Sequence, residues 1–221
     1  MNYRALAITL TVFLVRSDLP ARAEAISLPN PKTAGTVSVE TVLASRRSVR
    51  DYATQPLTIA EVSQLLWAAQ GVTSEDGKRT APSAMHRYPL EIAVVVQSVN
   101  GLANGAYRYL PSKHALEPLV AAKPGARLLT GATSQAQVHS APAVFVIAAV
   151  YKRMGPGAKN RTWTDYEAGL ASENLLLEAV ALNLGAVVTG GADAGAVKDA
   201  VRFTGDEEVV VVIPVGHPAR P

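Results

Sequence analysis

Three arginines and a serine lie within five residues near the start of the chain, in the run Arg46-Arg47-Ser48-Val49-Arg50. If this run is extended, Arg46, Ser48 and Arg50 point to one face and Arg47 to the other, because side chains alternate along a strand. Two guanidinium groups and a hydroxyl on one face suit a phosphate, since a guanidinium offers a planar fork of donors. A solvated helix end, where cations meet the helix dipole, would explain the same spacing.

Two other segments have residues that would let a flat ligand approach the backbone. The run Thr80-Ala81-Pro82-Ser83-Ala84 stands between a polar stretch and an apolar one, and its side chains are small. Thr189-Gly190-Gly191 follows a short apolar run, and paired glycines permit unusual dihedrals and leave their amides free to donate. Either segment could equally be an ordinary turn.

Several other kinds of chemistry are excluded by what the sequence lacks. The chain has no cysteine, so disulfides, thiolate metal sites and cysteine nucleophiles are ruled out. Its four histidines do not have the spacing of a metal motif, and we expect no metal. The phosphate loop, the dinucleotide fingerprint and the hydrolase nucleophile elbow are all missing. Any redox chemistry must therefore come from a bound cofactor.

Length and charge indicate one enzyme-sized domain without a nucleic-acid partner. A chain of 221 residues is long enough for a single domain with a substantial core. The formal net charge is only +3, no block of like charges stands out, and aromatic residues make up 5%. Nucleic-acid binding therefore has little support.

The N-terminal residues have the layout of an export signal. Arg4 gives a positive start, residues 5–15 form a hydrophobic run, and Ala21-Arg22-Ala23 offers a cleavage site. The run is shorter than the roughly 20 residues that a spanning helix needs, so we expect no stable membrane span. We predict a signal peptide over residues 1–23, an extended arm over 24–37, and a periplasmic or secreted domain over 38–221. A leader on a cytoplasmic enzyme is the alternative.

Local signals predict a mixture of helices and strands in this domain. Ser38 caps a short helix, while Thr58 and Glu61 form a capping box before a helix that ends at Gly71. Further helices are expected over 124–135, 166–184 and 194–203, and strands over 90–97, 107–109, 143–150, 186–189 and 209–215, with a polar loop over 155–162. Strict alternation is absent, so the predicted class is α+β in one domain.

In order and spacing, these segments resemble nitroreductase-family flavoproteins. The resemblance begins at Ser45-Arg46-Arg47-Ser48-Val49-Arg50-Asp51-Tyr52 and covers about residues 38 to 220. Leu65-Leu66-Trp67-Ala68-Ala69-Gln70-Gly71 and Ala81-Pro82-Ser83-Ala84 with Tyr88-Pro89-Leu90-Glu91 are similar to the branch that includes SagB/ThcOx-type dehydrogenases. Gly105-Ala106-Tyr107-Arg108-Tyr109, Gly190-Gly191 and Val212-Ile213-Pro214-Val215-Gly216-His217-Pro218 continue it.

The resemblance implies an FMN-binding homodimer with a central, mainly antiparallel sheet flanked by helices. It also implies hydride transfer through flavin N5, from NADH or NADPH to nitroaromatic or quinone-like small molecules. By the same resemblance, Arg46, Arg47, Ser48 and Arg50 would hold the phosphate and ribityl chain, helped by Arg220. The other implied flavin contacts are Pro82, Ser83, Ala84, His86, Gly190 and Gly191. No residue is singled out as catalytic.

The chain departs from the family after Pro82-Ser83-Ala84, where Met85-His86-Arg87 stands in place of smaller residues. Met85 and His86 are expected near the flavin ring, where they would alter ring contacts or substrate access. Two alternatives to a generic reductase stay open. One is an azoline-to-azole dehydrogenase of the SagB type, and the other is a flavin-binding protein with little turnover.

Overall fold

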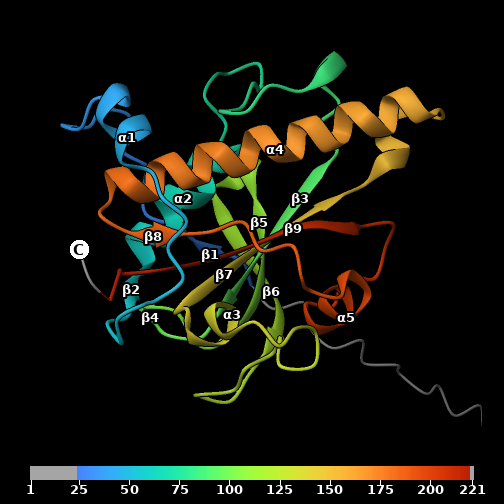
Figure 1. Cartoon of the computed structure of the whole chain (residues 1–221). Coiled ribbons are helices and arrows are strands. Elements are labelled where there is room, and N and C mark those ends of the chain that lie inside the picture. Colours follow the sequence, from blue (N-terminus) through green and yellow to red (C-terminus); the bar gives the residue numbers. More distant parts are fainter. Residues whose placement is uncertain (1–23, 220–221) are drawn as a thin grey trace, which may run out of the picture.

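The core of the molecule is a seven-stranded sheet in which every neighbouring pair is antiparallel (Figure 1). The computed structural model describes residues 24–219, so the expected signal peptide and Arg220 lie outside the described residues. In spatial order the strands are β1 (Ile26–Ser27), β6 (Ala115–Ala121), β5 (Gly105–Leu110), β3 (Leu90–Val96), β7 (Ala143–Ala149), β9 (Glu208–Gly216) and β8 (Gly185–Ala186). A separate parallel pair joins β2 (Leu57–Thr58) to β4 (Val99–Asn100).

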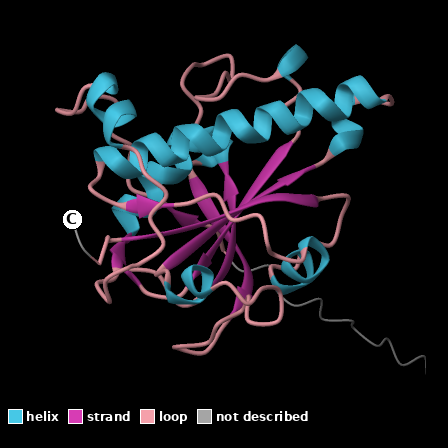
Figure 2. Ribbon diagram, viewed as in Figure 1, coloured by secondary structure: helices cyan, strands magenta, loops and turns pink. Residues whose placement is uncertain are grey.

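Helices cover both faces of the sheet, as Figures 1 and 2 show. One face carries α2 (Ile59–Gln70) and α4 (Ala158–Ala181), and the other carries α3 (Ala136–Ser140) and α5 (Ala194–Ala200), while α1 (Val39–Ser45) lies against α4. Short 3₁₀ turns are η1 (Ala84–His86), η2 (Pro111–Lys113) and η3 (Tyr151–Met154). Two apolar cores result, one on each side of the sheet. The α+β class and the mainly antiparallel sheet are confirmed.

Local sequence signals define α2, whereas packing holds α4 in place. Thr58 Oγ1 accepts from the Glu61 N–H at 3.2 Å while Glu61 Oε2 accepts from the Thr58 N–H at 2.7 Å, which confirms the capping box. The helix α2 ends at Gly71, whose backbone is extended, and the position requires glycine because a Cβ there would lie 2.1 Å from the Trp67 ring. The buried face of α4 carries mostly alanine and leucine, so the helix packs closely against α2 and the sheet.

Two expectations about the elements are wrong. No helix covers residues 124–135, because Gly125 adopts a φ of +76° and the chain continues in isolated turns until α3. The expected loop over 155–162 is helical from Ala158, so α4 begins eight residues earlier than the sequence predicts. Polar residues in its first turns point to solvent, and their pattern had indicated a loop.

Candidate flavin site

The arginine segment, residues 46–50, is extended and lies beside β8. Ser48 pairs in parallel with Ala186, and the Val49 N–H donates to the Ala186 carbonyl at 3.1 Å. This close approach requires glycine at position 185, because a Cβ there would lie 2.5 Å from a Val49 methyl group. A backbone hydrogen bond therefore holds Val49 beside β8 without the help of Arg46 or Arg50. The helix-end explanation also holds in part, because Arg46 is the C-cap of α1 and Arg47 donates to the Ala44 carbonyl in the last turn of that helix.

Ser48 and Arg50 line one hollow of about 470 Å³ together with Val49, and Arg47 lines another of about 430 Å³. Arg46, which was expected on the same face as Ser48 and Arg50, lines neither of these two hollows. Arg47 donates to the Ala44 and Arg46 carbonyls. Arg46 lies 3.9 Å from the Glu173 carboxylate of α4, with about a third of its side chain exposed. Such a half-exposed pair contributes little, so the Arg46 guanidinium remains available to an anion.

The C-terminal tail runs along the continuation of this segment. The Ala53 N–H donates to the His217 carbonyl at 2.8 Å, and the Ala219 N–H donates to the Asp51 carbonyl at 2.9 Å. Ala219 lines the same hollow as Ser48 and Arg50. Arg220 follows directly but lies outside the described residues, so its phosphate contact stays a prediction.

Gly190 and Gly191 leave the same edge of the sheet, four and five residues after Ala186. The Thr189 N–H pairs with the Val212 carbonyl at 2.8 Å, whereas the Thr189 hydroxyl is buried without a hydrogen-bond partner. Within residues 24–219, neither glycine N–H has a hydrogen-bond partner. A Cβ at Gly190 would meet nothing within 4 Å, so its backbone faces open space.

The segment Pro82-Ser83-Ala84 leads into a strained turn, here called the 84–88 turn. Met85, His86 and Tyr88 have φ values of 55°, 54° and 45°, which non-glycine residues rarely adopt. The Met85 side chain is 59% exposed, whereas Ser83 and Ala84 are half-buried. The turn thus exposes Met85 and His86, while the half-buried Ser83 and Ala84 form its base.

Glu167 of α4, which sequence reasoning missed, fixes that base. Its Oε1 accepts from the Ala84 N–H at 2.8 Å, and its side chain also hydrogen-bonds Ser83. The residue is 5% exposed, and burial raises the pKa of its carboxyl above the ordinary value, although the two hydrogen bonds lower it in part. A charged residue among the alanines and leucines of the buried face of α4 was the available signal.

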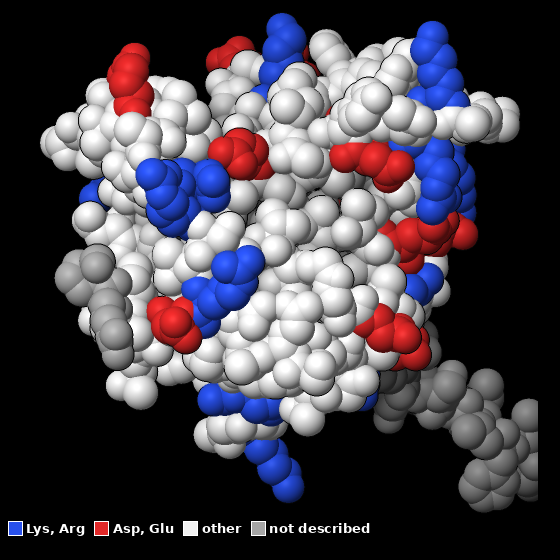
Figure 3. All heavy atoms as spheres, viewed as in Figure 1, with Lys and Arg blue, Asp and Glu red and all other residues white. Residues whose placement is uncertain are grey.

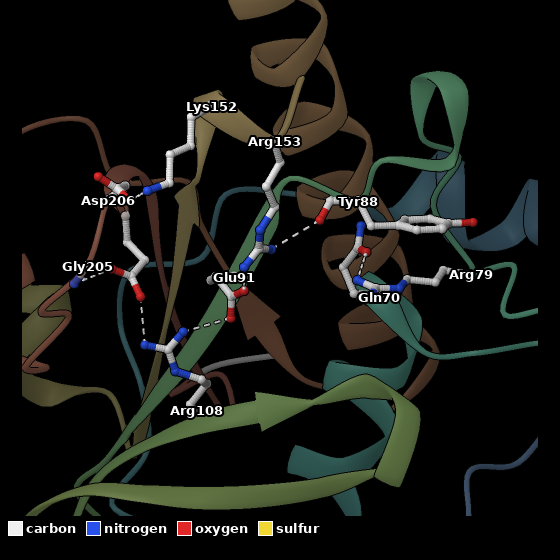
Figure 4. Close-up of polar contacts among 10 residues, drawn as sticks. Gln70, Arg79, Tyr88, Glu91, Arg108, Lys152, Arg153, Gly205 and Asp206 are labelled. Carbon is white, nitrogen blue, oxygen red and sulfur yellow. Dashed lines mark hydrogen bonds and ion pairs between the residues drawn. The ribbon is translucent and has the colours of Figure 1, made fainter. Parts of the chain in front are cut away.

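Tyr88 at the far end of the turn is held by two arginines, as Figure 4 shows. The Arg79 guanidinium carbon stands 4.3 Å from the Tyr88 ring centroid, a cation–π contact, and Arg79 donates to Gln70. Arg153 donates to the Tyr88 carbonyl at 3.3 Å and pairs with Glu91. The turn is therefore anchored at both ends.

Glu91 also belongs to a second, more buried ion cluster with Arg108 and Glu207 (Figure 4). Arg108 joins the Glu91 carboxylate at 2.9 Å and the Glu207 carboxylate at 2.8 Å. All three side chains are less than a fifth exposed. This cluster links β3, β5 and the residue before β9, and its three side chains form no hydrogen bond or ion pair with the arginine segment.

The sequence profile of the Nitroreductase family matches residues 43–217 of this chain. The chain belongs to the nitroreductase family. The protein MJ1384 of Methanocaldococcus jannaschii, assigned as a nitroreductase, is 37% identical over 183 residues, which span 82% of this chain and 91% of that protein.

Solved structures show the same nitroreductase fold. A crystal structure from Ralstonia eutropha, assigned as a nitroreductase, is 30% identical with a TM-score of 0.77, and the match covers 96% of this chain and 98% of that one. A structure from Desulfovibrio desulfuricans, assigned as a nitroreductase and solved in complex with FMN, is 21% identical with a TM-score of 0.60. That match covers 84% of this chain and 88% of the other, and shows the shared fold.

The residues around the arginine segment fit a phosphorylated flavin. Arg50 forms no ion pair among residues 24–219, and Arg46 has only its long contact to Glu173. The unpaired N–H groups of Gly190 and Gly191 leave from the same sheet edge and suit the polar rim of a flat ring. Within the same residues, no group of three His, Asp or Glu is placed to hold a metal ion, and no helix is long and apolar enough to cross a membrane.

Proposed function

We propose that this nitroreductase-family protein is an FMN-dependent oxidoreductase. One observation carries the proposal: the segment bearing Arg46, Ser48 and Arg50 is hydrogen-bonded alongside β8, and Gly190 and Gly191 follow that strand by four and five residues. Cationic side-chain donors and unpaired backbone N–H groups thus lie along one edge of the sheet. The FMN found in the related Desulfovibrio desulfuricans structure supports the choice of cofactor.

Each part of the site has a distinct role in this proposal. Arg46, Ser48 and Arg50 bind the phosphate and ribityl chain, with Arg47 and Arg220 adding positive charge nearby. Pro82, Ser83, Ala84 and His86 line the ring, and the amides of Gly190 and Gly191 donate to its polar atoms. When bound, FMN supplies two-electron chemistry between a reduced nicotinamide donor and a small-molecule acceptor, while the protein orients both. Solvent or the exposed His86 supplies protons.

A turnover assay tests the proposed reaction. FMN-free protein and protein reconstituted with FMN are each mixed with NADH or NADPH and a nitroaromatic or a quinone. We expect oxidation of NADH or NADPH only in the reconstituted sample. Equal rates with and without bound FMN would contradict the proposal.

We further propose that the active species is a homodimer. Tyr166 and Leu170 stand one turn apart on the outer face of α4 and are 65% and 47% exposed, and Val188 beside the glycine pair is 48% exposed. Figure 3 shows that the middle of this face carries few charged groups. Large exposed apolar residues on one face favour a protein interface. We expect Leu170→Arg to convert a dimer to a monomer in light scattering; a monomeric wild type would contradict the dimer.

Two alternative functions are tested on the same samples. The exposed, left-handed Met85 and His86 would obstruct a substrate, which favours a flavin-binding protein with little turnover. That alternative predicts bound FMN that neither nicotinamide reduces. An azoline dehydrogenase of the SagB type predicts instead oxidation of an azoline peptide to the azole, detected as a mass loss of two hydrogens.

For location, we propose export with cleavage after Ala23, leaving a periplasmic or secreted enzyme. Support comes only from the layout of the first 23 residues. Mass spectrometry of the protein expressed with its own leader tests this. A mature chain that starts at Glu24 is expected, and an intact Met1 would contradict the proposed export with cleavage.

A further inference from the structure

Glu167 is unusual among the acidic residues of α4 because it is buried and bonded to a loop. Its carboxylate binds no arginine or lysine in the described part of the chain, and its partners are the Ala84 N–H and the Ser83 side chain. A buried carboxylate without a cation is costly unless its hydrogen bonds are satisfied. The hydrogen bonds from Ala84 and Ser83 offset the cost of burying the Glu167 carboxylate, and they tie the segment that carries these two residues to α4.

The bonded segment is one that would not keep its shape unaided. Met85, His86 and Tyr88 all have positive φ, which non-glycine residues disfavour. Strained backbone of this kind persists only when its surroundings fix it. Ser83 also stabilises the far end of the turn, because its Oγ accepts from the Tyr88 N–H at 2.8 Å. Glu167 and Ser83 together thus hydrogen-bond both ends of the 84–88 turn.

We propose that Glu167 is a positioning residue that, through Ala84 and Ser83, holds the 84–88 turn in the shape that meets the flavin ring. The inference rests on the proposed FMN-binding function. Glu167 acts from the buried face of α4, whose neighbouring residues Thr164, Ala168 and Ala171 are themselves buried. The rigid helix therefore serves as the reference point for the strained turn. Because the hold is a pair of hydrogen bonds, glutamine should largely replace glutamate, whereas alanine should not.

Three variants of the full chain test this inference: Glu167→Ala, Glu167→Gln and, as a control, Ser172→Ala. Ser172 is buried on the same helix and bonds only the Ala168 carbonyl of that helix. Amide hydrogen exchange is measured on FMN-free protein. Removing a buried charge-assisted hydrogen bond should speed exchange at Ala84 and Tyr88 by about tenfold or more in the alanine variant. The glutamine and Ser172→Ala variants should stay close to wild type.

The second readout is the flavin itself, in FMN affinity and in the midpoint potential of bound FMN. We expect Glu167→Ala to weaken FMN binding by about tenfold and to shift the potential, and Glu167→Gln to restore both. Wild-type exchange at Ala84 and Tyr88 in the alanine variant would overturn the inference, as would a glutamine variant as impaired as alanine. If the alanine variant does not fold, Ser83→Ala takes its place and should speed exchange at Tyr88.

The two readouts separate this inference from the proposed function. If wild-type protein binds no FMN at all, the proposed function fails, and the flavin part of the inference fails with it. The exchange measurement on FMN-free protein still decides whether Glu167 holds the turn. If wild type binds FMN and Glu167→Ala binds it with the same affinity and potential, the proposed function stands and the positioning role is refuted.

Discussion

Removing both outward-facing arginines, in the variant Arg46→Ala/Arg50→Ala, should nearly abolish FMN binding while leaving the fold intact. Each guanidinium lost from a phosphate removes a charge-assisted contact of about 1.5–3 kcal/mol. Arg46 belongs at the low end, because its side chain is a third exposed and already faces Glu173. The two losses together predict a Kd for FMN raised by about 100- to 1,000-fold.

Stability should barely change, because backbone bonds hold the segment in place. The Val49 N–H still donates to Ala186, so exposed arginines can be truncated at a cost of about 0.5 kcal/mol or less. The assay is quenching of FMN fluorescence by FMN-free protein, with thermal unfolding measured in parallel. Lys113→Ala is the control, since it removes a positive charge from η2, beside β6 and near the opposite edge of the sheet from β8. A double variant whose Kd stays within about threefold of wild type would refute the phosphate assignment.

Three further predictions concern stability and site geometry. Gly185→Ala should cost about 1–3 kcal/mol in urea unfolding and weaken FMN binding, because the new methyl group would stand 2.5 Å from a Val49 methyl group; an unchanged FMN affinity would contradict this. Arg108→Met should cost about 3–5 kcal/mol, since it leaves the buried Glu207 carboxylate without a cation and leaves Glu91 with Arg153 alone; a loss below about 1 kcal/mol would contradict the role of the cluster. Burial lowers the pKa of His114 below its ordinary value of 6.5. As the pH falls through about 6.5, the His114 side chain therefore becomes protonated in the unfolded chain but not in the folded one. The free energy of unfolding should decrease from about pH 6.5 down to the pKa of His114 in the folded protein. Thermal unfolding at about pH 7.5 and about pH 5.5 should show a larger drop for wild type than for His114→Gln, and equal drops would refute the assignment.

The parts of the fold that could be predicted are those with local signals. The helix α2 carries its own capping box and its own terminating glycine, so Thr58, Glu61 and Gly71 define it without reference to the rest of the chain. Strand β6 could not be predicted, because Pro118 interrupts its pattern. In the structure Pro118 pairs with Tyr107 beside a register shift, where a residue without an N–H is tolerated. That tolerance depends on a partner strand the local pattern does not reveal.

The same division applies to the candidate site. Ser48 and Arg50 could be assigned to one face because alternation along a strand is a local property, and both line the same hollow, whereas Arg46 lies against Glu173 of α4. The strained 84–88 turn could not be predicted, since positive φ at Met85 and His86 is imposed by distant contacts. Glu167 is 83 residues from its partner Ala84, and only tertiary structure brings the two together.

The most direct test of the central claim is the visible spectrum of the purified protein, recorded after incubation with FMN and desalting, and again after anaerobic addition of NADH or NADPH. The account predicts a yellow protein with about one FMN per chain whose flavin absorbance is bleached by at least one of the two donors. A protein that emerges colourless from desalting would contradict the assignment of Arg46, Ser48, Arg50 and the glycine pair to a flavin site, and with it the proposed function.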